Sequence, residues 1–206
     1  AFVLHALLVA GLLHDRRLAD IVDPLIRRLA GMVTPRGLGF SEHFLPDGDD
    51  TAAAVAVLAA AGYREFAGAL APFQAVDHFK AYAFELHHAP TVTARGACAL
   101  ALCGQNEQPW LDALAQSQLP DGRWVGDKWN RSWLYTTAVV LHAFAGTANG
   151  APVRAGLRAL TTFQRADGGW GVQGKSSLQE TAYAVLALNT QRNGPEWDEH
   201  AQASWQ

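Results

Sequence analysis

Cysteine is scarce in this sequence of 206 residues. Only Cys98 and Cys103 are present, five positions apart in an apolar segment. Two cysteines placed in this way do not suggest the disulfide framework of a small secreted domain. We therefore predict that both are reduced thiols in the core of a cytoplasmic protein.

Charged residues are also few: they make up 17% of the chain, and their formal sum is −3. The basic residues are scattered and form no stripe of the kind that binds nucleic acid. Residues 1–13 are apolar enough to resemble the core of a signal peptide, but they lack an initiator methionine, a basic start and a cleavage site. No apolar run approaches the length of a transmembrane helix. We expect neither a nucleic-acid partner nor a transmembrane segment.

One dipeptide, Thr-Ala, recurs along the chain. It begins at Thr51, Thr93, Thr137 and Thr181, at intervals of 42, 44 and 44 residues. Each copy precedes small apolar residues, which predict buried helices over 53–61, 97–102, 139–145 and 183–188. A loop and a second, amphipathic helix follow, for example over 65–73, 110–118 and 153–163. Residues 4–13 resemble a fifth, degenerate copy.

Helix pairs repeated in this way must stack on one another to bury their apolar faces. An open superhelix of the HEAT kind and a toroid with inner and outer rings both fit. The first helix of each pair is rich in Ala, Val and Gly, which suits close packing around a central axis. We therefore predict an all-α fold, an α/α toroid that is an incomplete or complete barrel of six helix pairs. We expect it to be a single domain over residues 1–206, belonging to a longer chain.

Two turns between the predicted helices share the pattern Gln-x-x-Asp-Gly-x-Trp, at residues 118–124 and 164–170. Asp-Gly favours a tight turn, because glycine tolerates a positive φ. The Gln amide can bind backbone groups at a helix end, and the Trp ring can cover the joint. We predict that these turns are structural rather than catalytic.

Three carboxylates stand within four positions, at Asp47, Asp49 and Asp50. Like charges this close raise one another's pKa. The motif opens into the predicted helix over 51–61, whose backbone amides can hold some of the carboxylates in the ionised form. A more crowded carboxyl would keep its proton and act as a general acid. A well-capped helix and a surface cation site are the alternatives.

Residues 47–52, Asp-Gly-Asp-Asp-Thr-Ala, resemble the Asp-x-Asp-Asp-Thr-Ala motif of class II terpene cyclases, and the Gln…Trp turns resemble the QW repeats of that superfamily. The flanks are similar to bacterial diterpene cyclases of copalyl diphosphate synthase type. They include Gly-Leu-Gly-Phe-Ser at 37–41, Asp-Lys-Trp-Asn-Arg-Ser at 127–132 and Glu-Thr-Ala-Tyr at 180–183. The resemblance implies an α/α-barrel domain, called the β domain in this superfamily.

The resemblance also implies residue roles. Asp49 matches the middle aspartate, which is the acid of the family, and Asp47 and Asp50 would hold and polarise it. Lys128 falls where relatives that accept diphosphates carry a lysine. Aromatic rings near the starts of the inner helices would stabilise carbocations by about 0.5–2 kcal/mol each. The substrate-binding candidates among them are Phe40, Trp129, Trp133 and Tyr135.

One stretch departs from the family pattern. Related bacterial sequences commonly read Glu-Arg-Asn-Pro and then Thr-Asn-Ala-His in the part that corresponds to residues 84–100. Here residues 85–90 read Glu-Leu-His-His-Ala-Pro, and residues 93–97 read Thr-Ala-Arg-Gly-Ala. Adjacent histidines point apart on a helix and have no spaced cysteine or carboxylate partner, so we predict no metal site at His87 and His88.

The reaction implied is protonation-initiated cyclisation of a prenyl diphosphate to a bicyclic diphosphate of copalyl type. We expect the substrate to be geranylgeranyl diphosphate or a shorter prenyl diphosphate. The diphosphate would be retained, because the Asp-Asp-x-x-Asp motif of ionising synthases is absent. Mg²⁺ could accompany the substrate, and a second helical domain of the longer chain would share the active site. A squalene-hopene-type triterpene cyclase and a non-catalytic α/α interaction module remain the alternatives.

Overall fold

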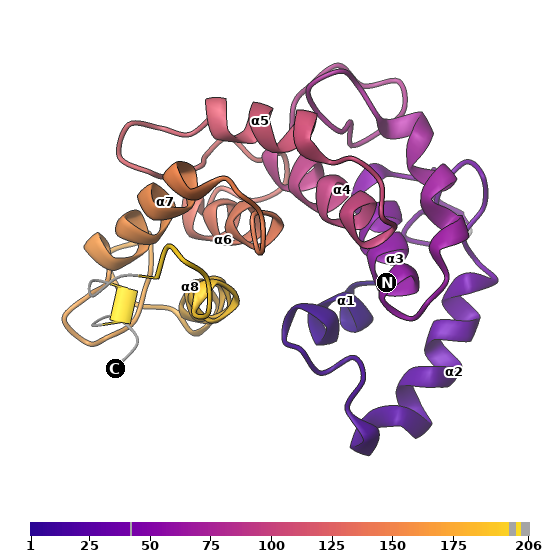
Figure 1. The fold of residues 1–206 in the computed structure, drawn as a ribbon, viewed down its shortest axis with the longest axis horizontal. Coiled ribbons are helices and arrows are strands. Elements are labelled where there is room, and N and C mark those ends of the chain that lie inside the picture. Colours follow the sequence, from indigo (N-terminus) through magenta and orange to yellow (C-terminus); the bar gives the residue numbers. More distant parts are fainter. Residues whose placement is uncertain (42, 198–200, 203–206) are drawn as a thin grey trace. The chain divides into compact units, whose positions relative to one another are not determined.

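The structure, a computed structural model, describes residues 1–41, 43–197 and 201–202 (Figure 1). The regular secondary structure of these residues is helical; they include isolated β-bridges but no strand. None of their helices has the length and apolar character needed to cross a membrane. The chain divides into two compact units, Ala1–Trp110 and Leu111–Gln206. The prediction of one domain over residues 1–206 stays a prediction.

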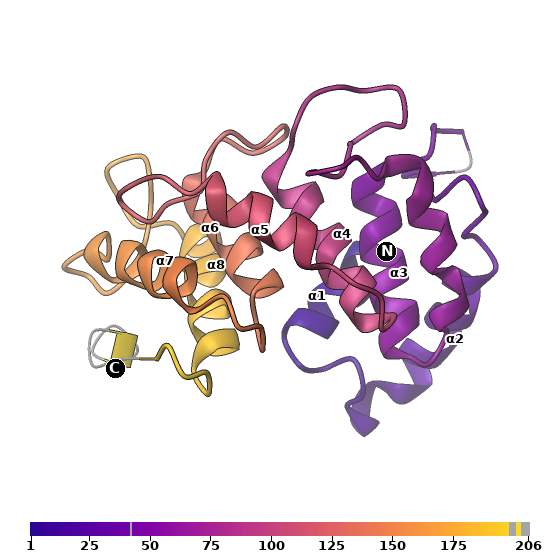
Figure 2. The ribbon, with the colours of Figure 1, turned by 45° about the horizontal axis from the view of Figure 1, so that its top comes forward.

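The first unit is built around a helix that is buried on every side, α3 (Gly48–Ala60). All its residues from Asp50 to Ala59 are buried, which the small side chains of the run Ala-Ala-Ala-Val-Ala-Val permit. Helix α4 (Pro90–Leu102) lies beside it, and Figure 2 shows the two in contact along their lengths. The other elements of this unit are α1 (Phe2–Val9), the 3-10 helix η1 (Arg16–Leu18), α2 (Ala19–Ala30) and the 3-10 helix η2 (Arg64–Phe73).

The second unit pairs two inner helices, α6 (Trp133–Ala143) and α8 (Leu178–Gln191), which pack against each other (Figure 2). Helix α7 (Gly150–Thr162) packs on α6, and most of α5 (Gln108–Gln116) also belongs to this unit. Buried leucines, including Leu141 and Leu188, contribute to the core of the unit.

All four predicted inner helices are present, but each begins three to seven residues earlier than the apolar run predicts. The structure places each Thr-Ala pair inside its helix, because the three or four residues before it already form the first turn. The predicted helices over 4–13, 110–118 and 153–163 correspond to α1, α5 and α7. Helix α2 was not predicted.

The amphipathic helix predicted over 65–73 is present, and the structure shows that it is a 3-10 helix, η2. Pro72 lies inside it and has no backbone N–H to donate. Gly68 loses more backbone entropy on folding than other residues do, which makes it unfavourable in a helix. The element still packs on α3, so its amphipathic character was predicted correctly.

A repeated hydrogen bond explains why Thr-Ala recurs. Each threonine hydroxyl accepts the backbone N–H of a large buried residue that lies 11 to 14 positions earlier. The pairs are Thr51 with Leu38 (2.9 Å), Thr93 with Phe79 (3.1 Å), Thr137 with Trp124 (3.0 Å) and Thr181 with Trp170 (3.0 Å). Each inner helix is therefore fastened to the turn that precedes it.

The Gln…Trp turns have the predicted structural role. The side-chain amides of Gln118 and Gln164 donate to the carbonyls of Gly122 and Gly168, each over 2.9 Å. Both glycines have positive φ, 87° and 79°. The indole N–H groups of Trp124 and Trp170 donate to the carbonyls of Leu114 and Leu160, near the end of the preceding helix, over 2.7 and 2.8 Å. Both rings are buried.

The two thiols are free, as predicted. Burial raises the pKa of Cys98 to about 11, and it also raises the pKa of Cys103. Since the thiolate is the nucleophile, both groups are poorly reactive near neutral pH.

Replacing Thr137 by Val tests the threonine contact. The change keeps the shape of the side chain and leaves the buried Trp124 amide without its acceptor, so we expect the free energy of unfolding to fall by about 1–3 kcal/mol. Urea unfolding followed by circular dichroism measures it. The matched control is Thr162→Val at an exposed position at the end of α7, which should change stability by less than about 0.5 kcal/mol. Equal stability of the two variants would contradict the assigned role.

Candidate active site

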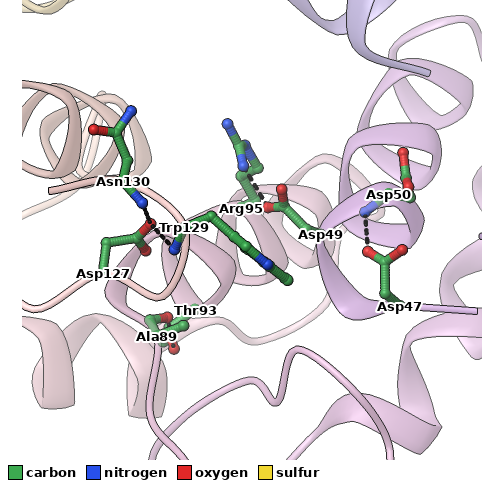
Figure 3. Close-up of polar contacts among 9 residues, drawn as sticks. All are labelled: Asp47, Asp49, Asp50, Ala89, Thr93, Arg95, Asp127, Trp129 and Asn130. Carbon is green, nitrogen blue, oxygen red and sulfur yellow. Dashed lines mark hydrogen bonds and ion pairs between the residues drawn. The ribbon is translucent and has the colours of Figure 1, made fainter. Parts of the chain in front are cut away.

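The three aspartates of the motif lie at the N-terminus of α3 (Figure 3). Asp47 is the N-cap residue, in an extended conformation, and its Oδ1 accepts the backbone N–H of Asp50 over 2.8 Å. The N–H of Gly48 donates to the carbonyl of Ala81 over 2.8 Å. A Cβ on Gly48 would overlap the carbonyl oxygen of Lys80, so only glycine fits between the first two aspartates. The loop before α4 thus fixes the start of α3.

The carboxylates of the motif have different surroundings. Asp47 and Asp50 are buried, at 8% and 7% exposure. The side chain of Asp49 is 13% exposed and points away from Asp47, toward α4 (Figure 3). One helical turn therefore presents a buried carboxyl pair and a third carboxyl that faces a different element.

The partner of Asp49 is Arg95 on α4, whose Nη1 donates to Asp49 Oδ1 (Figure 3). The Arg95 side chain is only 9% exposed, and its guanidinium lies 5.5 Å from the ring centroid of Phe2. No role was predicted for Arg95 from the sequence. The available signal was that Arg95 is the only charged residue in the sequence of α4.

Burial raises the pKa of Asp47 to about 7; the charges of Asp50 and Asp49 add to this effect, whereas the hydrogen bond from the Asp50 amide opposes it. Burial also raises the pKa of Asp50, with a further contribution from the charge of Asp49. One carboxyl of this pair therefore holds a proton close to neutral pH. A crowded, poorly solvated carboxyl was predicted in this motif. The assignment of Asp49 as the acid stays a prediction.

The segment before α6 is a turn held by Asp127. Its Oδ2 accepts the backbone N–H groups of Trp129 and Asn130 over 3.2 and 3.1 Å (Figure 3). The exposed Lys128 places Nζ 5.3 Å from the centroid of the Trp129 ring, which is itself 51% exposed. This turn presents a cation and an aromatic face to solvent on the second unit.

Two other predicted aromatic residues lie on the first turn of α6. The Trp133 ring packs edge-on against Phe163 with centroids 5.0 Å apart, and the guanidinium of Arg123 lies 5.3 Å from the Trp133 centroid. The ring of Tyr135 packs edge-on against Tyr183, at 4.9 Å.

The predicted site residues thus fall into two groups. Asp47, Asp49 and Asp50 lie together in the first unit, as does Phe40, whose ring is 77% exposed and packs edge-on against Phe44. The substrate-binding candidates Lys128, Trp129, Trp133 and Tyr135 lie in the second unit.

A pocket of about 320 Å³ lies in the second unit between the end of the 127–132 turn and the start of α8. Glu180 lines it and accepts hydrogen bonds from the hydroxyls of Ser132 (2.6 Å) and Ser177 (3.0 Å). These two serines are the N-cap residues of α6 and α8, so the carboxylate joins the two helix starts. Arg131 and Tyr183 line the same pocket. Apart from the resemblance of residues 180–183 to family sequences, no signal in the sequence pointed to Glu180.

Two of the histidines in the loop before α4, His78 and His88, pack on one another. The His88 ring lies edge-on to His78 with centroids 5.7 Å apart, and burial lowers the pKa of His88. Across the residues that the structure describes, no three or more His, Cys, Asp or Glu side chains are grouped so as to hold a metal ion.

The pKa of Asp47 makes stability depend on pH. The folded protein keeps this proton up to about pH 7, whereas an unfolded chain releases it near pH 4. The native state binds more protons between these values, so the free energy of unfolding should fall as pH rises, by on the order of 1–3 kcal/mol. Urea unfolding from about pH 4 to about pH 7.5 measures this slope.

Asp47→Asn keeps an N-cap acceptor and removes the titrating carboxyl, so we expect the pH slope to flatten and stability at neutral pH to rise. Asp121→Asn is the matched control. Asp121 is exposed, and the Arg123 side chain holds the pKa of its carboxyl below the usual range, outside the pH window studied. An unchanged slope in Asp47→Asn would contradict the protonation assigned to the Asp47–Asp50 pair.

Comparison with known proteins adds to this geometry. Residues 89–201 match the family described as the squalene-hopene cyclase C-terminal domain. The chain is 45% identical over 192 residues to (+)-kolavenyl diphosphate synthase of Herpetosiphon aurantiacus, covering 93% of this chain and 37% of that protein. It is 32% identical over 210 residues to a copalyl diphosphate synthase of Streptomyces anulatus, covering 94% of this chain and 38% of that protein.

The fold is similar to that of a solved structure, the ent-copalyl diphosphate synthase from Streptomyces platensis. The TM-score is 0.82 at 27% identity, covering 98% of this chain and 41% of that one. This match confirms the predicted all-α, α/α toroid fold class; the repeat length of about 44 residues stays a prediction. The chain spans about two fifths of the length of these relatives.

The aspartate motif at the start of a buried helix, the Gln…Trp turns and the match over residues 89–201 agree: this chain belongs to the class II terpene cyclases, in the family of the squalene-hopene cyclase C-terminal domain.

Proposed function

We propose that the protein carrying this chain is a class II diterpene cyclase. It protonates the terminal alkene of geranylgeranyl diphosphate and forms a bicyclic diphosphate of copalyl type, with the diphosphate retained. The observation that supports this most is the arrangement of the motif. A buried carboxyl pair, Asp47 and Asp50, lies next to a third carboxyl, Asp49, that points away from it and is held by a separate element.

The first chemical step asks for a strong acid in a site with little water. In this proposal the O–H bond of Asp49 breaks, and its proton forms a C–H bond with the terminal alkene carbon. The alkene π electrons supply that bond and leave a tertiary cation. Further alkenes attack the cation in turn and close the rings. The last cation loses a proton to a base that the described residues do not identify.

The carbocation and the diphosphate need different surroundings. Aromatic faces stabilise the cation without reacting with it, and we assign this role to Phe40, Trp129, Trp133 and Tyr135. Lys128 is an exposed cation on a turn that Asp127 fixes, which suits contact with a diphosphate.

Mg²⁺ enters in this proposal with the diphosphate, as the counter-ion of the substrate. The described part of the chain supplies no set of ligands that would hold the ion by itself, so no step is assigned to it.

The relatives favour a diphosphate substrate over squalene. The two curated relatives and the solved structure named above carry names of diphosphate synthases, although the matching family is named for squalene-hopene cyclase. Since the chain spans about two fifths of their length, we propose that a second helical domain of the same protein completes the active site.

Replacing Asp49 by Asn in the intact protein tests the acid. We expect turnover of geranylgeranyl diphosphate to fall by at least about 10³-fold, since the amide cannot give up a proton to an alkene, while the helical circular dichroism spectrum is kept. Product formation is followed by mass spectrometry, with squalene and farnesyl diphosphate offered in parallel. The control Asp23→Asn, at an exposed position of α2, should keep wild-type turnover. Equal turnover in Asp49→Asn would refute the acid assignment and favour a non-catalytic role for this domain.

Replacing Lys128 by Ala tests the diphosphate contact. We expect the KM for geranylgeranyl diphosphate to rise by roughly tenfold with a smaller change in kcat, because the lysine binds the unreacting end of the substrate. Lys175→Ala, at an exposed lysine of the same unit, is the control. An unchanged KM would remove Lys128 from the binding site.

A further inference from the structure

We propose that Arg95 is a positioning residue for the acid: it binds one oxygen of Asp49 and stabilises the carboxylate that remains after proton transfer. This inference rests on the proposed function and assigns a role within the same site.

The geometry fixes Arg95 from two sides. Its Nη1 donates to Asp49 Oδ1, and its guanidinium lies 5.5 Å from the Phe2 ring centroid. Both members of the ion pair are shielded, with side chains 9% and 13% exposed. Water therefore screens the pair weakly, and a charge-assisted hydrogen bond is stronger here than at the surface.

The backbone position of Arg95 is also fixed. The next residue, Gly96, faces the buried ring of Phe79, and a Cβ there would lie 2.6 Å from the ring carbons. The absence of a side chain allows α4 to approach Phe79, whose backbone N–H is bound by Thr93.

The chemistry follows from what each group can donate. A guanidinium is a donor only, whereas a carboxylic acid has one acceptor oxygen and one hydroxyl. By binding Oδ1, Arg95 makes this atom the acceptor and leaves Oδ2 to carry the proton. When the Oδ2–H bond breaks and the hydrogen forms its C–H bond with the alkene, Asp49 becomes negatively charged.

Arg95 stabilises that charge more strongly than it stabilises the neutral acid, so the interaction lowers the barrier to proton transfer. It also offsets the repulsion that the new carboxylate meets from any ionised member of the Asp47–Asp50 pair. A proton from solvent restores the acid after the product leaves.

The test compares Arg95→Ala, Arg95→Lys and wild type in the intact protein, with geranylgeranyl diphosphate as substrate. We expect Arg95→Ala to lower kcat by about 10²–10³-fold, because it removes one electrostatic donor from the site. The KM should change by less than roughly threefold, since Arg95 does not contact the substrate. We expect Arg95→Lys to recover part of the lost kcat, and added guanidinium at millimolar concentration to raise the kcat of Arg95→Ala. A merely structural arginine would show neither recovery.

Arg17→Ala is the matched control. It removes an Asp–Arg ion pair of the same unit, with Asp15, at a site where the arginine is exposed, so kcat should stay at the wild-type value. If the wild-type protein forms no cyclised product, the proposed function itself is refuted. If the wild type is active and the kcat of Arg95→Ala lies within threefold of the wild-type value, only the role of Arg95 is overturned. A loss of kcat that neither lysine nor guanidinium relieves would also overturn it.

Discussion

The N-terminus of α3 is the constraint on which the rest of this chain depends. Because α3 is buried, water cannot accept hydrogen bonds from its first backbone amides. The protein itself must therefore supply the acceptors and hold the helix start in place. Asp47 supplies the cap, and Thr51 binds the backbone of Leu38 and so fastens the helix to the preceding turn. The backbone of Gly48 is bound to the loop before α4. Asp47, Gly48 and Thr51, which hold the start of this buried helix, therefore belong to the same motif as the candidate site.

The same helix start separates the three carboxyls by environment. Burial raises the pKa of both Asp47 and Asp50, so the two are reluctant to ionise together, whereas Asp49 forms a direct ion pair with a guanidinium from the neighbouring helix. Pairs of titratable groups in unlike surroundings are a common basis for acid chemistry in enzymes. In this chain the difference arises because one turn of α3 faces the loop before α4 on one side and α4 itself on the other.

The repeated sequence features allowed the inner helices and their preceding turns to be predicted. Thr-Ala marked all four inner helices, and the Gln…Trp turns were correctly predicted as structural, because both features are local and recur in register. The helix starts were placed too late, since the first turns differ in composition from one helix to the next and do not continue the runs of small apolar residues. The residue spacing over 65–73 predicted a helix that packs on α3 but did not reveal its 3-10 geometry.

The site was only partly predictable. The motif at residues 47–52 is contiguous, so its place at a helix start could be predicted from the sequence alone, whereas the catalytic roles of its aspartates stay predictions. Arg95 contacts Asp49 across 46 positions, and Glu180 contacts Ser132 across 48. Such contacts form only when the helices pack against each other. The one indication of the Arg95–Asp49 contact in the sequence was a single charged residue in an apolar helix.

The central claim is that Asp49 donates the proton that starts cyclisation. The most direct test is to incubate the intact protein with geranylgeranyl diphosphate in D₂O, treat the product with phosphatase and measure its mass. The acid exchanges with solvent, so the claim predicts a cyclised product that carries one deuterium, and no such product from Asp49→Asn. A cyclised product without deuterium, or the same deuterated product from the variant, would contradict it.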